Sequence, residues 1–535
     1  MRKFLFVLAL LTATLSSRAQ TDPFQIYLEP MAIEGLPGIQ SFAYGQYNGL
    51  WVIIGGRTDG LHQRQPFASF LPEDCNSEIT VVDPIAGKVW RAPLSSLSLP
   101  LQDQMSSTNM EFYQEGDYLY LIGGYGYSRT IDSKLTYALI TAVDLRGVIY
   151  AVQEKKDLAP FFRQVTDIQF AVTGGYLHKL GDTYFLIGGQ KFDGNYNPMN
   201  HPTFTQSYTN AIRKFTLDDD GINLKITHLP AIVDTAAFHR RDYNVVPQLF
   251  PDGKEGLTAF SGVFQIKADI PMLDAVNIDD DGYETDGDFA QYYNHYHCAN
   301  LPLYSASTGE MHTLFFGGIA QYFEQGGILT EDSDVPFVNT IARVTRNQEG
   351  RMAEYRLPVE MPELLGASAA FIPTPGIPMF ANGVIKLDEL ASDPVMVGYI
   401  YGGIQSSAAN IFWVNDGSES IAQNIVYKVF IKNRPGTNKH VLNPQSTNGT
   451  QLQIYPNPAE KTFTFLYRLH GAKKIWLNVS DENGHSLLNE DISKKLVAGI
   501  NRFTREIKSF KIGGVYVVTV TTDGVAAIQK ILVKE

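Results

Sequence analysis

The sequence predicts an all-β fold built from six similar units, followed by a smaller β-domain. Three observations predict it: apolar runs ending in two glycines recur along the chain, a short apolar run precedes each across a tight turn, and a loop and a second hairpin follow each. With 535 residues, 44% hydrophobic and 12% aromatic, the chain can bury the core that such a repeat fold needs.

The glycine pairs mark the units. They end the runs GLWVIIGG, GDYLYLIGG, GDTYFLIGG, HTLFFGG and VGYIYGG, with the first glycines at positions 55, 123, 188, 317 and 402. The interval from 188 to 317 is about twice the usual one, so a further copy is expected inside it. LTAFSG, which ends at Ser261 and Gly262, supplies that copy and gives six units.

Each unit reads as four strands. Asn-Gly and Gly-Asp turns join the first two strands, as in FAYGQYNGLWVIIGG and YLHKLGDTYFLIGG. The second hairpin is expected in EITVVDPIAGKVWRAPL and its equivalents, among them ITAVDLRGVIYAV and LDAVNIDDDGYET. Four antiparallel strands per unit is the composition of a propeller blade, so residues 20–432 are predicted to form a six-bladed β-propeller.

The two ends of this region are predicted to pair. The last unit ends at NIVYKVFIK with only three strands, and Phe24 to Ile33 has the pattern of a missing outer strand. Pairing the first segment with the last closes the ring and leaves no long unpaired edge.

A strand ending in Gly-Gly, a long loop and a second hairpin with an aromatic residue on its last strand resemble the kelch repeat. The resemblance covers about residues 24–431. It departs from the family pattern because unit four lacks the double glycine, units two to six lack the tryptophan on strand four, and the units are long.

The two ends of the chain differ from the repeats. Residues 1–19 have a basic start, an apolar run and a small-x-small site, the layout of a secretory signal peptide. Residues 433–450 are rich in Asn, Thr, Pro and Gly and are predicted to be a linker. No later segment has the roughly 20 apolar residues that a membrane-spanning helix needs.

Residues 451–535 alternate in period two with Asn-Gly and Asp-Gly turns, which predicts a small Ig-like β-sandwich of about seven strands. YPNP at Tyr455–Pro458, D-x-N-G at Asp481–Gly484, GGVYVV at Gly513–Val518 and the terminal KILVKE resemble the type A C-terminal sorting domain of the type IX secretion system. The resemblance implies a secreted or cell-surface protein, type IX machinery as a partner, and a Bacteroidetes-type outer membrane.

The charge of the repeat region argues against one class of partner. Residues 20–431 hold 25 Lys and Arg against 48 Asp and Glu, a net charge of −23. Such a surface repels polyanions, so nucleic-acid binding is not expected.

Loops that lead into the first strand of each unit are expected to lie on one face, where binding sites usually form. Two segments there carry the candidate ligand-binding residues, His239, Arg240, Arg241, Asp242 and Tyr243 in the first and Tyr292, Tyr293, His295 and His297 in the second. The arginines could hold a carboxylate or sugar acid, or form an ion-pair network between blades. The aromatic segment could stack on a sugar, and its two histidines could either bind a metal or be satisfied by hydrogen bonds.

Two further features each leave alternatives open. Asn277, Asp279, Asp281 and Asp288 have the spacing of a calcium loop, yet Asp-Gly here also makes a hairpin turn. No cofactor is expected unless calcium binds this loop. Cys75 and Cys298, the two cysteines, are expected on one face, which suggests a disulfide, although two separate thiols fit the sequence as well.

Two functions fit these features. The first is a secreted or cell-surface binding module for a glycan or protein ligand. The alternative is a sugar-modifying enzyme resembling the kelch-type sialic acid mutarotases, in which Arg240 or Arg241 holds a carboxylate and His239 or a nearby acid moves a proton.

Overall fold

The computed structural model describes residues 22–198, 203–391 and 394–433, and in the C-terminal region residues 452–455, 459, 462–469, 475–481, 486–493, 499–506, 514–522 and 525–533. Residues 24–434 form one compact unit, and the C-terminal strands belong to a second. The predicted signal peptide, and the predicted linker apart from Asn433, lie outside the described residues.

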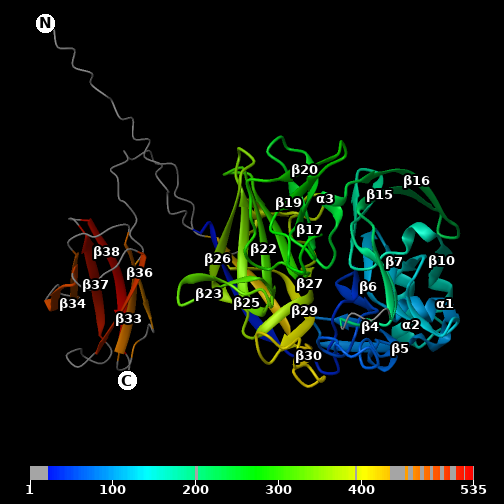
Figure 1. The fold of residues 1–535 in the computed structure, drawn as a ribbon, viewed down its shortest axis with the longest axis horizontal. Coiled ribbons are helices and arrows are strands. Elements are labelled where there is room, and N and C mark those ends of the chain that lie inside the picture. Colours follow the sequence, from blue (N-terminus) through cyan, green and yellow to red (C-terminus); the bar gives the residue numbers. More distant parts are fainter. Residues whose placement is uncertain are drawn as a thin grey trace, which may run out of the picture. The chain divides into compact units, whose positions relative to one another are not determined.

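The first unit contains six antiparallel sheets of four principal strands, which follow one another along the chain (Figure 1). The strands, in the order in which they pair, are as follows: sheet 1, β2 (Ala43–Tyr47), β3 (Leu50–Ile54), β4 (Glu78–Asp83) and β5 (Lys88–Pro93); sheet 2, β6 (Thr108–Glu115), β7 (Tyr118–Ser128), β9 (Leu139–Asp144) and β10 (Phe162–Thr166); sheet 3, β11 (Tyr176–Leu180), β12 (Thr183–Ile187), β15 (Ala211–Asp219) and β16 (Leu224–Val233); sheet 4, β17 (Asn244–Leu249), β18 (Glu255–Phe260), β19 (Ala275–Ile278) and β20 (Tyr283–Asp286); sheet 5, β21 (Ala299–Ser305), β22 (Glu310–Ile319), β25 (Phe337–Arg346) and β26 (Met352–Glu360); sheet 6, β27 (Leu364–Pro373), β29 (Val395–Ser406), β31 (Val426–Asn433) and β1 (Phe24–Met31).

Short additional strands lie beside these sheets. β8 (Ser133–Thr136) pairs with β7, β28 (Ile385–Lys386) with β21, and β30 (Ser420–Ala422) with β29. Two separate hairpins, β13 (Gln190–Gly194) with β14 (Phe204–Tyr208) and β23 (Tyr322–Gln325) with β24 (Ile328–Glu331), extend the loops that follow β12 and β22. The loops after the second strands therefore carry structure of their own.

The predicted pairing of the first and last segments is confirmed. β1 runs antiparallel to β31 over its whole length, from Phe24 opposite Asn433 to Met31 opposite Val426. Ile26 is buried opposite Ile431, so the strand is fixed by its apolar face as well as by its backbone.

A closed ring of six backbone hydrogen bonds joins the sheets at the start of their first strands. In each bond the N–H of one residue donates to the carbonyl oxygen of the equivalent residue in the preceding sheet. Ser41 of sheet 1 donates to Ser368 of sheet 6, which closes the ring. The donor and acceptor pairs are Ser41 to Ser368 (3.2 Å), Asn109 to Ser41 (3.1 Å), Gly174 to Asn109 (3.4 Å), Asp242 to Gly174 (2.8 Å), His297 to Asp242 (2.7 Å) and Ser368 to His297 (2.8 Å). We call these six residues the inner ring; each sheet contributes one of them.

Close packing against the next sheet explains why each second strand ends in two glycines. The second glycine donates its N–H to a carbonyl oxygen that leads into the next sheet, as Gly124 does to Val172 at 3.0 Å. The first glycine lies against that carbonyl: a Cβ on Gly123 would stand 1.9 Å from the oxygen of Val172. Ser261 and Gly262 occupy the same position in sheet 4, where both have positive φ and Gly262 donates to the carbonyl of His295, so the sixth copy is confirmed.

The hydrophobic core lies between neighbouring sheets. Separate clusters of buried side chains fill the contacts between sheets 1 and 2, 2 and 3, 3 and 4, 4 and 5, 5 and 6, and 6 and 1. The last of these includes Trp51 from sheet 1, whose ring lies edge-on to that of Tyr399 from sheet 6 at 5.0 Å. The first and last sheets are therefore packed together as the sequential neighbours are.

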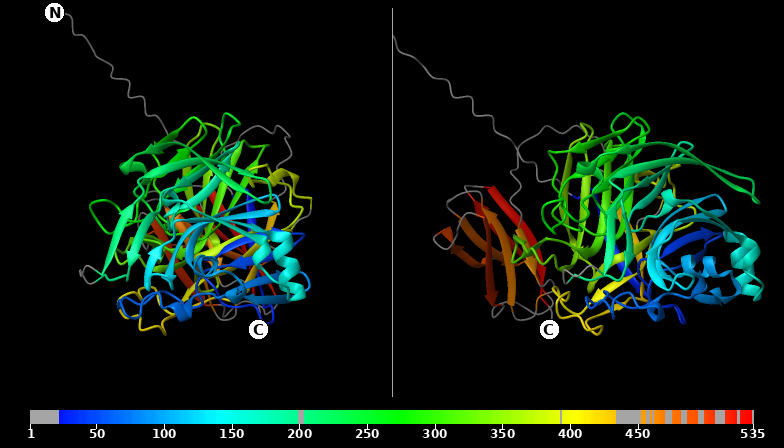
Figure 2. Two further views of the ribbon diagram at one scale, coloured as in Figure 1. Left: turned by 90° about the vertical axis from the view of Figure 1, so that its right-hand side faces the viewer. Right: turned by 45° about the vertical axis from the view of Figure 1, so that its right-hand side comes forward.

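One predicted strand is wrong. The segment after β9, expected to form the second hairpin of unit two, is the helix α2 (Leu145–Glu154), and the outer strand β10 comes later (Figure 2). Asp144 caps this helix by accepting the N–H of Gly147 at 3.1 Å, and Val148 and Val152 are buried on one face. The helical spacing of these apolar residues, rather than alternation, decided the local structure. Two shorter helices, α1 (Leu99–Met105) and α3 (Thr235–Phe238), lie before the first strands of sheets 2 and 4.

The C-terminal unit has seven strands in its described part, the number predicted. One sheet contains β32 (Leu452–Tyr455), β33 (Thr462–Leu469) and β36 (Gly499–Glu506), and the other contains β35 (Ser486–Asp491), β34 (Ile475–Asp481), β37 (Val515–Thr522) and β38 (Val525–Leu532). Leu477 and Val518 are fully buried among the side chains of its core. In the described part of the chain, the helices are all too short or too polar to span a membrane.

Candidate functional site

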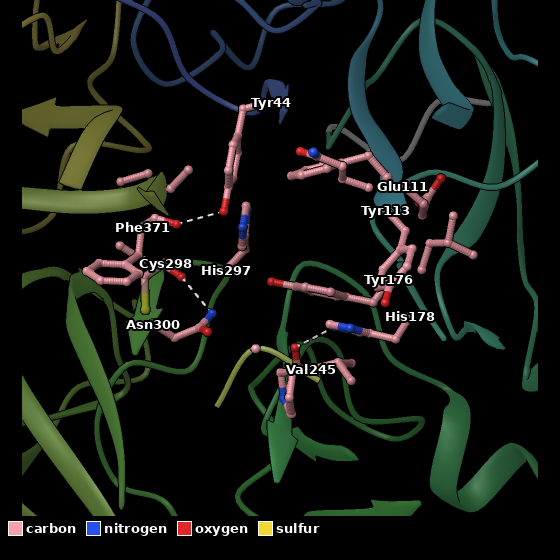
Figure 3. Close-up of a pocket in the computed structure, with 18 of the residues that line it drawn as sticks. Tyr44, Glu111, Tyr113, Tyr176, His178, Val245, His297, Cys298, Asn300 and Phe371 are labelled. Carbon is pink, nitrogen blue, oxygen red and sulfur yellow. Dashed lines mark hydrogen bonds between the residues drawn. The ribbon is translucent and has the colours of Figure 1, made fainter. Parts of the chain in front are cut away.

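The first strands of all six sheets line one cavity of about 400 Å³ (Figure 3). Residues of each first strand line this cavity, and in several strands consecutive residues do so. The lining is mainly apolar and aromatic, with rings from Phe42, Tyr44, Phe112, Tyr113 and Phe371. This composition is typical of a small-molecule site, and the volume falls within the usual range of such sites, about 300–1,000 Å³.

Tyr176 and His178 project from β11 into one side of the cavity (Figure 3). Their rings are parallel, with centroids 6.0 Å apart. His178 Nε2 lies 3.0 Å from the carbonyl oxygen of Val245, so Nε2 carries the proton and Nδ1 remains an acceptor. Burial lowers the pKa of His178 to about 4, which keeps its imidazole neutral at neutral pH.

The hydroxyl of Tyr176 and the ring of His297 face one another across the cavity (Figure 3). Their ring centroids are 5.8 Å apart, and the rings are nearly perpendicular. Among the described residues the Tyr176 hydroxyl has no hydrogen-bond partner. Burial lowers the pKa of His297 to about 4, so this imidazole is also neutral. The Tyr176 hydroxyl is therefore a buried polar group that the described part of the protein leaves unused.

Glu111 is a buried carboxyl at the contact between sheets 2 and 3. One oxygen accepts the N–H of Gly175 at 2.8 Å, and the other has no hydrogen-bond partner in the described part of the chain. Burial raises the pKa of Glu111 to about 8, so the group is protonated at neutral pH. Its second oxygen lies beside Gly123, where an added Cβ would stand 3.0 Å away. Glu111 is also among the residues that line the cavity.

Other polar lining groups connect neighbouring first strands. Tyr44 donates to the carbonyl oxygen of Phe371 at 2.8 Å, which links sheets 1 and 6. The amide of Gln114 pairs with the backbone of Gln46, accepting at 2.7 Å and donating at 2.8 Å, which links sheets 1 and 2. These bonds hold the wall rigid, and a rigid wall orients a ligand with little loss of entropy.

Among the described residues that line the cavity, two are acidic and none is Lys or Arg. Glu111 and Asp242 contribute carboxyl groups, and neither Lys nor Arg is among the residues that line it. Burial raises the pKa of Asp242. Arginine is the usual partner of a carboxylate ligand, so this chemistry favours a neutral ligand over an acidic one.

In the first predicted segment, residues 239–243, some residues make structural hydrogen bonds and others line a cavity. Arg240 is fully buried and each of its three guanidinium nitrogens donates a hydrogen bond: Nε to Ala237, Nη1 to Ser261 and Nη2 to Asp274. Its role is the structural network that the sequence left open. Tyr243 lines the central cavity, but its hydroxyl donates to the carbonyl oxygen of Ile187 at 2.7 Å.

The remaining residues of this segment lie near a second, smaller cavity. His239 stacks on Tyr208 with centroids 3.8 Å apart and lines neither cavity. Arg241 lines the smaller cavity, where its guanidinium contacts the hydroxyl of Tyr208 and lies over the ring of Phe264. Asp242 lines both cavities. An arginine that holds a carboxylate in the central cavity is therefore not supplied by this segment.

Of the four candidate residues in the second predicted segment, only His297 lines the central cavity. His295 is buried, with Nε2 bonded to the carbonyl oxygen of Gln291 at 2.8 Å and Nδ1 accepting the N–H of Gln321 at 3.0 Å. Both of its nitrogens are used, which leaves none for a metal. Tyr292 and Tyr293 lie beside Glu354, which accepts their N–H groups, and they line neither cavity.

The predicted calcium loop forms the turn between β19 and β20. Asp279 accepts the N–H groups of Asp281 and Gly282, both at 2.9 Å, as an Asp at a hairpin turn does. Asn277 accepts from Arg346 at 2.7 Å, and Asp288 is not among the carboxylates that cluster here, which in the described chain are those of Asp279, Asp280 and Asp281. Asp281 accepts from Lys254 at 2.7 Å, so Asn277, Asp279 and Asp281 have separate hydrogen-bonding partners.

The predicted disulfide between Cys75 and Cys298 is wrong: both are free thiols. Cys75 precedes β4 in sheet 1, where its Sγ lies 3.8 Å from the carbonyl oxygen of Leu71. Cys298 is buried at the start of β21 in sheet 5, with Sγ 3.8 Å from Asn244 Nδ2. The cysteines belong to sheets that are not neighbours, and each thiol has its own surroundings.

The sequence reasoning missed the residues on the first strands themselves. Tyr44, Glu111, Tyr113, Tyr176, His178 and Asn300 all line the cavity. A signal was present, because FAYGQY, MEFYQE and YLHKL place aromatic and polar residues at alternate positions of strands that should be wholly buried. The residues predicted from the sequence lie in the loops before these strands, so the strand residues were not among them.

Comparison with known proteins adds evidence for the C-terminal unit. Residues 453–534 match the family described as secretion system C-terminal sorting domain. No curated protein matches the chain. One solved structure, titled "Structure of YjhT", is similar over 59% of this chain and 84% of that one, with a TM-score of 0.37 and 12% identity.

The sorting-domain match agrees with the sandwich of two sheets and with the sequence pattern of the C-terminal region. Such a domain marks proteins that the type IX secretion system exports, and it interacts with the machinery of that system. The chain is therefore an all-β protein that carries a secretion system C-terminal sorting domain at residues 453–534 and is exported to the cell surface or beyond it.

Proposed function

We propose that residues 20–432 are a six-bladed kelch-like β-propeller that binds a neutral glycan in its central cavity. The six sheets would be the blades, residues 1–19 a signal peptide, residues 433–450 a linker and residues 451–535 a type A sorting domain. The observation that carries the binding function is the cavity of about 400 Å³ to which every sheet contributes aromatic or polar side chains.

The size of the cavity favours a glycan over a protein ligand. A stable protein interface buries roughly 1,200–2,000 Å², whereas a concave site of this volume encloses a small molecule. Aromatic rings can stack on the apolar face of a sugar, and the neutral imidazoles of His178 and His297 and the amide of Asn300 can bond its hydroxyls. The absence of Lys and Arg from the lining favours a neutral sugar.

A glycan array tests this proposal with the full chain and two variants. Asn300→Ala removes a cavity amide that otherwise bonds the carbonyl oxygen of Cys298 at 3.3 Å. Asn489→Ala, at an exposed position on β35, is the matched control. We expect wild type and control to bind the same sugar, and Asn300→Ala to bind it about fivefold more weakly, as expected for one lost hydrogen bond of about 1 kcal/mol. Failure of the wild type to bind any glycan would refute the proposal.

A second candidate is a sugar-modifying enzyme, and one observation favours it. The Tyr176 hydroxyl is buried without a partner in the described chain and faces His297, and the two groups could exchange protons with a sugar that reaches them. Arg240 and Arg241 have no part in this version, because neither lines the cavity.

Anomer exchange followed by NMR tests the enzymatic candidate. The wild type would accelerate the interconversion of the α and β forms of a reducing sugar, and Tyr176→Phe would slow it. Tyr150→Phe, at a tyrosine that is 55% exposed on α2, is the control. An unaccelerated rate across neutral and acidic sugars would remove this candidate and leave the binding proposal intact.

A further inference from the structure

A second cavity of about 120 Å³ adjoins the central one. Asn109, Gly174 and Asp242 line both cavities, and all three belong to the inner ring. The smaller cavity is below the usual size of an independent small-molecule site, so it suits a single ring-sized group. Its shared wall makes it a continuation of the central cavity.

Six of the fourteen residues that line the smaller cavity are aromatic, and they come from three sheets. His62 and Phe70 lie on the loop after β3, Tyr125 on β7, and Tyr196 beside the β13–β14 hairpin. His62 stacks on Phe70 with centroids 4.5 Å apart and meets Tyr196 edge-on at 4.6 Å. The rings therefore support one another and form a fixed aromatic surface.

Polar groups close the other side of this cavity. The side-chain amides of Gln190 and Gln206 are hydrogen-bonded to each other. Arg241 Nε lies 3.3 Å from Asp242 Oδ2, so the charges at the junction neutralise one another. Aromatic surface opposed by amides and a neutralised ion pair recognises a neutral, hydroxyl-rich ring.

Asp242 is fixed at the junction of the two cavities. Its N–H donates to Gly174 at 2.8 Å, and its carbonyl oxygen accepts from His297 at 2.7 Å. Its φ is +50°, and a Cβ on Gly174 would stand 2.8 Å from its Oδ1. The carboxylate is therefore held over a glycine, where a ligand that passes from one cavity to the other would meet it.

We propose that the smaller cavity is a second subsite, and that the ligand is a neutral oligosaccharide with one unit in the central cavity and the next against Tyr196. The inference rests on the proposed glycan-binding function. The Asp242 carboxylate accepts hydroxyl hydrogen bonds from the units on either side of it. A single sugar fills one subsite only, whereas two linked units fill both.

Titration calorimetry on the full chain tests this inference with neutral sugars of one to six units from the β-1,4-glucan, β-1,4-xylan, β-1,4-mannan, α-1,4-glucan and chitin series. In at least one series we expect the Kd to fall about tenfold or more from the monosaccharide to the trisaccharide. Tyr196→Ala should abolish that gain and leave monosaccharide affinity unchanged, whereas Asn300→Ala should weaken both. Tyr150→Ala is the matched control.

The outcomes separate the two proposals. A monosaccharide that binds as tightly as its oligomers in every series, or a gain that survives Tyr196→Ala, would overturn the second subsite while leaving the central site in place. Binding of no sugar in any series would overturn both proposals.

Discussion

The backbone N–H of Ser41 donates to the carbonyl oxygen of Ser368 at 3.2 Å, and this bond joins the first sheet of the repeat region to the last. It completes the inner ring, whose other five bonds join the remaining sheets in sequence. The ring surrounds one end of the central cavity, since five of its six residues line that cavity. The hydrogen bonds that join the first sheet to the last therefore also form one end of the central cavity.

The outer edge of this closure depends on β1. Ile26→Ala should lower the free energy of unfolding by about 2–4 kcal/mol, because it removes a buried side chain opposite Ile431. Gln25→Ala, at the exposed neighbouring position, should change it by less than about 0.5 kcal/mol. Urea unfolding followed by tryptophan fluorescence measures both. Equal effects would show that the strand contributes only its backbone.

The glycine pairs permit close approach between sheets. Gly123→Ala and Gly87→Ala are matched, since both glycines have φ +64°, but only Gly123 faces a carbonyl oxygen that a Cβ would meet at 1.9 Å. Gly87→Ala should cost about 1–2 kcal/mol for the left-handed conformation alone. Gly123→Ala should cost several kcal/mol more or prevent folding. Similar thermal unfolding midpoints for the two variants would contradict the packing explanation.

Glu111 makes stability depend on pH. Its pKa rises from 4.5 in the unfolded chain to about 8 in the folded protein, so the folded state binds the proton more tightly. Its contribution to stability is full below pH 4.5, declines as the pH rises and is lost above about pH 8. Glu111→Gln, which keeps the bond from Gly175 without an ionisable group, should flatten the fall in thermal midpoint between pH 5 and pH 9. An unchanged slope would show that Glu111 is ionised in the folded protein.

The two thiols should differ in reactivity. Cys298 is fully buried, and burial raises its pKa to about 12, whereas Cys75 is partly exposed. A thiol reagent should modify Cys75 in the native protein and Cys298 only after unfolding. Mass spectrometry of unreduced peptides should detect both as free thiols, and a linked pair would contradict the structure.

The sequence by itself determined the number of repeats, the position of each glycine pair, the outer strand supplied by the N-terminus and the sorting domain. These features are local: a strand that ends in two glycines or a turn at Asp-Gly follows from the backbone preferences of a few neighbouring residues. The eroded copy at Ser261 and Gly262 was found in the same way, because its spacing and not its composition identified it. The exception is α2, a segment whose pattern predicts a strand although its buried apolar residues have helical spacing.

The site was decided by the tertiary structure. Whether Arg240 faces a ligand or a neighbouring loop depends on where Ala237, Ser261 and Asp274 lie around it, and no pattern within its own segment specifies that. Tyr44, Tyr176 and Asn300 come from sheets 1, 3 and 5 and share a cavity only because the ring closes. Local sequence sets the direction of each strand, but the packing between sheets determines which side chains meet.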